Sequence, residues 1–111
     1  MEILFNTSKL RKWCTDENVL TRTYGPRRAK VLRRRLDQLR AAPALSVMRG
    51  LPGRCHELTG DRKGTLAIDL DGPYRLIFEP AEDPPPRLQS GGLDWDAVTA
   101  IRVLDVENYH G

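Results

Sequence analysis

The chain has 111 residues, of which 40% are hydrophobic and 30% are charged, and this composition fits one globular domain spanning residues 1–111. No apolar run approaches the roughly 20 residues of a membrane span, and the N-terminus shows no signal-peptide pattern, so we expect a cytoplasmic protein with no membrane partner. The net charge of +3 is uneven, because residues 1–50 carry +8 (12 Lys/Arg, 4 Asp/Glu) and residues 51–111 carry −5 (6 and 11). A basic half favours a phosphate-bearing or acidic partner.

The first part of the chain predicts a strand followed by two antiparallel helices. Residues 2–5 form the expected strand, and either Asn6 or Thr7 can cap the helix that follows. The Gly-Pro pair at 25–26 is typical of one helix ending and another beginning, with the second helix at about 26–41. Its apolar residues recur every three or four positions and predict one buried face: Ala29, Leu32, Leu36 and Leu39.

Cations cover much of the rest of this second helix. They are either its solvated face, or a surface for an acidic protein, or a surface for structured RNA that binds the phosphate backbone with little sequence preference. As candidate RNA-binding residues of the helix we take Arg27, Arg28, Lys30 and Arg34.

The second half of the chain predicts strands. After a segment at 44–51 that is either one helical turn or an extended connector, strands are expected at 56–58, 65–70, 74–79 and 98–106. Leu66, Ile68 and Leu70 alternate along one face, Asp71-Gly72 indicates a hairpin, and the last strand is apolar enough to be central. Residues 80–96 predict a long loop in which Trp95 anchors the chain against the core. The order favours an α+β fold with helices on one face of a mainly antiparallel sheet.

A set of side chains suited to RNA cleavage gathers on a few short segments. Because an unperturbed imidazole exchanges its proton near neutral pH, His56 and His110 are candidates for general acid and base, while Tyr109 can stack on a base or donate its hydroxyl. Arg75 lies at opposite parity to Leu76 and Phe78, which predicts that it projects away from the helices and can bind a phosphate. Arg62 and Lys63, in a turn, are further candidate RNA-binding residues and form one predicted set with the cations of the helix. These groups suffice for attack of a ribose 2′-hydroxyl on the adjacent phosphate without a metal or other cofactor.

A metal site is not expected from the sequence. Two cysteines and two histidines provide four potential ligands, but their spacing at 14, 55, 56 and 110 matches no zinc pattern. We expect both cysteines to be reduced thiols that pack as small hydrophobic residues.

The sequence resembles bacterial toxins of the RelE/ParE superfamily, and within it the HigB-like killer proteins of plasmid-maintenance modules. Four segments carry the resemblance: 51–64 (LPGRCHELTGDRKG), 71–80 (DGPYRLIFEP), 91–95 (GGLDW) and 106–110 (VENYH). The resemblance implies a small mainly antiparallel sheet packed against an N-terminal helical hairpin. It also implies a ribosome-dependent endoribonuclease (an mRNA interferase) that cuts mRNA in the aminoacyl site, and an antitoxin with a helix-turn-helix domain through which the pair binds operator DNA.

The resemblance also assigns residues and alternatives. His56, Arg75, Tyr109 and His110 match catalytic positions of HigB-like toxins, whereas Asn108 replaces an aspartate and Thr59 stands near a position that is often lysine. Arg62 or Lys63 is a candidate to supply that missing charge. Two other functions stay open: a ParE-like inhibitor of DNA gyrase, and a non-catalytic nucleic-acid-binding or co-repressor module that works through the basic helix.

Overall fold

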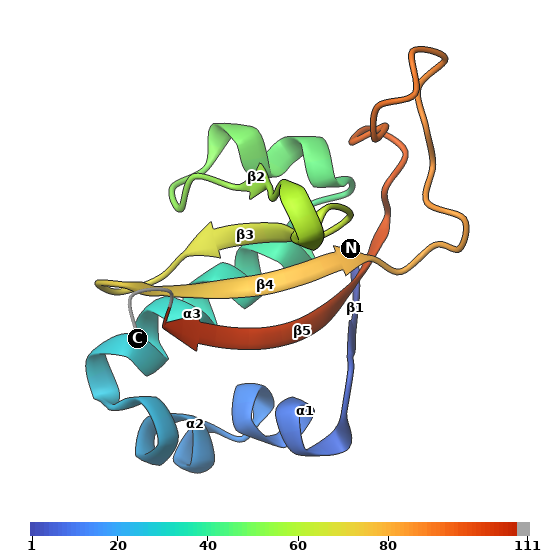
Figure 1. The fold of residues 1–111 in the computed structure, drawn as a ribbon. Coiled ribbons are helices and arrows are strands. Elements are labelled where there is room, and N and C mark those ends of the chain that lie inside the picture. Colours follow the sequence, from blue (N-terminus) through green and yellow to red (C-terminus); the bar gives the residue numbers. More distant parts are fainter. Residues whose placement is uncertain (109–111) are drawn as a thin grey trace.

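A five-stranded sheet forms the centre of the protein in a computed structural model that describes residues 1–108 (Figure 1). The strand order is β1-β5-β4-β3-β2; β1 runs parallel to β5, and the other neighbours are antiparallel. The strands are β1 (Glu2–Phe5), β2 (His56–Glu57), β3 (Leu66–Asp69), β4 (Tyr74–Pro80) and β5 (Ala100–Asn108). The predicted α+β fold with a mainly antiparallel sheet is therefore confirmed, and β5 is an interior strand, as its apolar character predicted.

Three helices, rather than the predicted two, precede the rest of the sheet. They are α1 (Ser8–Thr15), α2 (Glu17–Tyr24) and α3 (Pro26–Ala41). The bounds predicted for α3 are confirmed, but the prediction of one continuous helix before it was wrong. Asp16 adopts an extended backbone between α1 and α2, and its Oδ1 accepts hydrogen bonds from the backbone N–H groups of Asn18 and Val19. Because the Asp16 side chain caps the N-terminus of α2, the helical backbone is interrupted between α1 and α2.

The core lies between α3 and one face of the sheet, which α3 crosses from behind in Figure 1. The predicted apolar face of α3 is buried, and so are the sheet residues expected to meet it. These core residues include Leu32, Leu36 and Leu39 on the helix and Leu66, Ile68, Leu76 and Phe78 on the sheet. The face of β3 and β4 that the alternation pattern assigned to the core is thus the face that packs against α3.

The connection from α3 to β3 directs His56 toward the sheet. Residues 44–51 contain a short 3₁₀ helix, η1 (Leu45–Gly50), so the helical option for this segment is the correct one. Gly53 then passes so close to the core that a Cβ atom there would lie 2.7 Å from Ile68 Cγ2 and 2.9 Å from Arg35 Nε. Its φ of +108° also favours glycine. Its carbonyl accepts a 2.7 Å hydrogen bond from the backbone N–H of Asp69, which docks the segment on β3.

The segment between β4 and β5 is the predicted long loop, and it extends from one end of the sheet in Figure 1. Trp95 anchors it, as expected: its side chain is buried, and its indole N–H donates a 3.1 Å hydrogen bond to Glu57. The guanidinium of Arg49 stacks 4.0 Å from the ring centroid. The loop is therefore tied to both η1 and β2.

Candidate active site

The face of the sheet that points away from α3, here called the outer face, carries the candidate catalytic side chains. Side chains alternate along a strand, so Arg75 and Ile77 point away from the helix when Leu76 and Phe78 pack against it. Arg75 is paired in register with Glu107 on β5. His56 is paired with Ala67 on β3, which is in turn paired with Ile77. Register therefore assigns His56, Arg75 and Glu107 to the same face, as predicted for Arg75.

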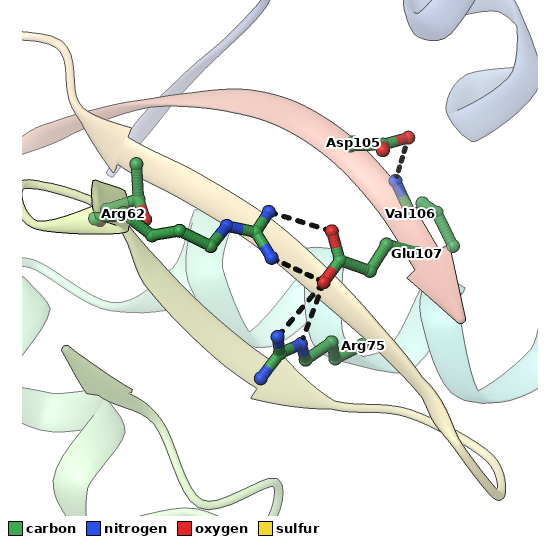
Figure 2. Close-up of polar contacts among 6 residues, drawn as sticks. Arg62, Arg75, Asp105, Val106 and Glu107 are labelled. Carbon is green, nitrogen blue, oxygen red and sulfur yellow. Dashed lines mark hydrogen bonds and ion pairs between the residues drawn. The ribbon is translucent and has the colours of Figure 1, made fainter. Parts of the chain in front are cut away.

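Two arginines converge on one carboxylate on the outer face (Figure 2). Glu107 Oε1 accepts from Arg62 Nη1 at 2.6 Å and from Arg75 Nη2 and Nε at 3.0 and 3.2 Å, while Oε2 accepts from Arg62 Nη2 at 2.7 Å. Only 16% of the Arg75 side chain and 19% of the Glu107 side chain are exposed, against 40% for Arg62. The bonds from Arg62, and then those from Arg75, lower the pKa of Glu107 from its ordinary 4.5 to about 2.

Arg62 reaches this cluster from a different part of the chain. It ends the short 3₁₀ helix η2 (Gly60–Arg62) and spans the outer face to β5. Lys63 follows it as an exposed residue, and Thr59 precedes η2. Of the two residues considered as sources of the charge expected near Thr59, Arg62 is therefore the one whose guanidinium lies beside Arg75.

His56 lies on β2, at the edge of the sheet, with its ring oriented by the backbone. Its Nδ1 is 2.7 Å from the carbonyl oxygen of Arg54. A carbonyl only accepts, so Nδ1 must carry the proton, and in the neutral ring Nε2 keeps the lone pair. Arg54 has a φ of +51°, and its side chain forms a 2.9 Å ion pair with Asp69. The backbone thus orients the ring through Nδ1 and leaves Nε2 as the nitrogen that can face a substrate.

His56 and Arg75 share the outer face but stand apart on it. They are separated by two strand spacings and by two residues along the strand, which places their Cα atoms roughly 12 Å apart. A ligand that contacts both residues must therefore span this distance. The other two predicted catalytic residues, Tyr109 and His110, lie outside the described residues. Asn108, the last residue of β5, is paired with Tyr74.

The predicted RNA-binding residues fall on two different surfaces. Arg62 reaches across the outer face and Lys63 is exposed in the turn beside it, whereas the candidates on α3 lie on the other side of the sheet. Arg28 donates to the carbonyl of Tyr24 at 3.0 Å and stacks 3.6 Å from the Tyr74 ring centroid, which makes it a structural link to the β3–β4 hairpin. Arg27 lies 3.6 Å from Asp71 in the same hairpin, while Lys30 and Arg34 are exposed.

Glu107 was not identified from the sequence. The predicted last strand ends at residue 106, whereas β5 extends to Asn108, and only the pairing of β4 with β5 shows that Glu107 stands opposite Arg75. The sequence offered only a weak signal for Glu107. It is a carboxylate near the end of an apolar strand, and the preceding strand in the chain carries an arginine.

Neither a metal-ligating cluster nor a membrane-spanning helix is found in the described part of the chain. Within residues 1–108, no group of three or more His, Cys, Asp or Glu side chains is placed to hold a metal ion. Over the same range, no helix combines the length and the hydropathy needed to cross a membrane.

Among solved structures, the chain is similar to a YoeB/ParE toxin from Agrobacterium tumefaciens. The TM-score is 0.59, and the match covers 97% of this chain and 98% of that one. This chain has a YoeB/ParE-type toxin fold. Sequence identity is 11%, so the likeness establishes the fold alone. The predicted RelE/ParE-like fold is confirmed, and the assignment to the HigB-like branch stays a prediction. No protein-family model and no curated protein matches the sequence.

Proposed function

We propose that this protein is the toxin of a toxin–antitoxin module and acts as a ribosome-dependent endoribonuclease on mRNA. The observation that carries the proposal is the outer face, where His56 and the Arg62–Arg75 pair lie on one side of a sheet with a toxin fold. A histidine and paired guanidiniums on one surface can supply proton transfer and charge stabilisation for cleavage of a ribose-phosphate chain.

The proposed reaction is attack of a ribose 2′-oxygen on the adjacent phosphorus. One group removes the 2′-hydroxyl proton, the P–O bond to the 5′-oxygen breaks, and a second group protonates that leaving oxygen. His56 and His110 share these two proton transfers, with the assignment of acid and base left open. Arg75 stabilises the charge that develops on the phosphate, and Tyr109 stacks on a base or serves as the acid.

The proposed partners follow from the resemblance to HigB-like toxins. They are a cognate helix-turn-helix antitoxin, and mRNA in the aminoacyl site of a ribosome in the cytoplasm. Operator DNA would be reached only through the antitoxin. The exposed cations of α3 give the protein a second basic surface that suits ribosomal RNA.

Induced expression of single variants tests the proposal. We expect His56→Ala and Arg75→Ala each to reduce mRNA cleavage, measured by primer extension, by about 100-fold or more, because each removes a group from the reacting centre. Arg102→Ala is the matched control, since it removes an arginine paired with Glu79 at 3.2 Å between the same two strands. Growth arrest and cleavage that persist in both site variants would show that the outer face is not the active site.

A ParE-like DNA gyrase inhibitor is the second candidate, because the similar solved structure is described as both YoeB and ParE. DNA breaks without mRNA cleavage after induction would favour it. A co-repressor that works through α3 is the third candidate, because the helix exposes Lys30 and Arg34 away from the outer face. It would be favoured if charge reversal on α3 abolished function while the histidine variants stayed active.

A further inference from the structure

The two arginines of the outer face already bind an anion of the protein's own. Arg62 forms two parallel hydrogen bonds to the two oxygens of Glu107, and Arg75 adds two more to Oε1. Guanidinium forks bind carboxylates and phosphates with the same planar, two-pronged geometry. The position that Glu107 occupies is therefore suited to the non-bridging oxygens of a phosphodiester.

We propose that Glu107 is an internal competitor of RNA phosphate: its carboxylate fills a two-arginine anion site, and a phosphodiester binds there by displacing it. This inference rests on the proposed function and deepens it. It assigns Arg62 as a second phosphate-binding residue, and Glu107 as the group that limits affinity when no RNA is present.

Charge and exposure make the exchange feasible. A phosphodiester carries one negative charge, as the carboxylate does, so the exchange leaves both guanidiniums paired and no buried charge uncompensated. Arg62 is 40% exposed and belongs to a short connecting segment, so one side of the cluster is open to solvent. Once displaced, the carboxylate regains hydration. Figure 2 shows Glu107 reaching from β5 toward the two arginines.

The exchange does not depend on protonation. The pKa of Glu107, lowered to about 2 by the two arginines, means that the carboxylate is ionised throughout the physiological range. RNA must therefore compete with a full negative charge. Docking of mRNA raises the local concentration of phosphate at the site, and this shifts the equilibrium from bound Glu107 toward bound phosphate.

Another ion pair on the same two strands provides a matched control. Glu79 on β4 pairs with Arg102 on β5 at 3.2 Å, and both side chains are about one-third exposed. Glu79→Gln therefore removes a carboxylate from a comparable pair that involves neither Arg62 nor Arg75.

Binding of a non-cleavable RNA to the purified protein tests the inference. The probe is a fluorescent RNA oligonucleotide with a 2′-O-methyl group on every ribose, and its affinity is measured by anisotropy at neutral pH. We expect Glu107→Gln to bind about tenfold more tightly than the wild type, because a competing charge-assisted contact is removed. Glu79→Gln should leave the affinity unchanged. Adding Arg62→Gln to Glu107→Gln should abolish the gain.

Further measurements distinguish the possible failures. A folded Glu107→Gln protein that binds the probe no better than the wild type would overturn the inference, and would show that Glu107 only orients the arginines. If Glu107→Gln does not fold, Glu107→Asp serves instead: its shorter side chain keeps the charge but retracts from the arginines, so tighter binding is again expected, and unchanged binding overturns the inference. Cleavage by the wild type without any gain in Glu107→Gln would leave the proposed function intact. If Glu107→Gln gains affinity for the probe but the wild type does not cleave mRNA, the proposed nuclease activity is contradicted and the anion site is supported.

Discussion

Single residues of the outer face show what alternation along a strand can predict and what it cannot. The parity of Arg75 relative to Leu76 and Phe78 correctly predicted that Arg75 points away from α3. The pattern within one strand says nothing about which residue stands opposite it on the next. The pairing of Arg75 with Glu107, and the reach of Arg62 across both strands, depend on tertiary register and were therefore missed.

The depressed pKa of Glu107 predicts a contribution to stability that depends on pH. Its folded value of about 2 lies below its ordinary 4.5, so the ionised form is favoured in the folded state. The contribution is fully present above about pH 5, and is lost as the pH falls through 4.5 toward 2. Glu107→Gln lacks this ionisation. We therefore expect the difference in free energy of unfolding between wild type and Glu107→Gln to change between about pH 5 and 2 and to be constant from pH 6 to 8.

Urea unfolding over this pH range is the appropriate measurement. Glu79→Gln again serves as the comparison, since no second arginine is bonded to Glu79 among the described contacts. A wild-type minus Glu107→Gln difference that does not vary with pH would mean that the two arginines do not perturb the carboxyl group in solution.

At the scale of elements, hydrophobic periodicity predicted α3 to its ends but overlooked the break between α1 and α2. The apolar residues of α1 and α2 recur at helical spacing on both sides of the break, and the polar Glu17 that interrupts the stripe was not taken as the start of a new helix. The local signal was Asp16 itself, a strong N-cap residue placed before Glu17 and Asn18. An N-cap side chain favours the start of a new helix where periodicity favours continuation of the first, and in this protein a new helix starts after Asp16. The long loop and the hairpin turn were predicted because proline restricts the backbone and glycine admits the turn conformations that other residues avoid.

Removal of this cap gives a prediction for the helical region. Asp16→Ala takes away the acceptor for the N–H groups of Asn18 and Val19, so we expect it to lower the free energy of unfolding by about 1 kcal/mol. Asp16→Asn keeps a side-chain acceptor, so its free energy of unfolding should fall much less. Thermal unfolding followed by circular dichroism measures both. Equal stability of the alanine and asparagine variants would mean that α1 and α2 are separated for another reason.

At the scale of the whole molecule, the uneven charge seen in the sequence becomes two separate surfaces. The cations of residues 1–50 lie largely on the helices, while Arg62 and Arg75 lie on the outer face among acidic residues of the second half. Sequence reasoning combined Arg27, Arg28, Lys30 and Arg34 with Arg62 and Lys63 into one RNA-binding set. The packing of α3 against the opposite face of the sheet separates these two groups of cations. Local sequence patterns do not show this packing, because it depends on the tertiary structure.

This separation predicts that binding and cleavage can be disrupted independently. The double variant Lys30→Glu/Arg34→Glu should weaken binding to ribosomes and reduce the salt dependence of that binding by about one unit of slope for each phosphate that the helix no longer neutralises. His56→Ala should change neither the binding to ribosomes nor its salt dependence. Sedimentation with ribosomes at several salt concentrations measures the effect. Arg87→Glu, an exposed charge reversal in the loop before β5, is the control. If it weakens binding as much as the α3 variant does, net charge rather than the helix determines the interaction.

The close approach of Gly53 to Ile68 and Arg35 has a consequence for genetics. At this one position the backbone that leads to His56 is pressed between β3 and α3, and any side chain would push the histidine's strand away from the rest of the sheet. If the protein acts as proposed, a selection for cells that survive its expression would recover substitutions of Gly53 together with substitutions of the catalytic residues. A residue with no functional group would thus be scored as essential, solely because of where it lets the chain pass.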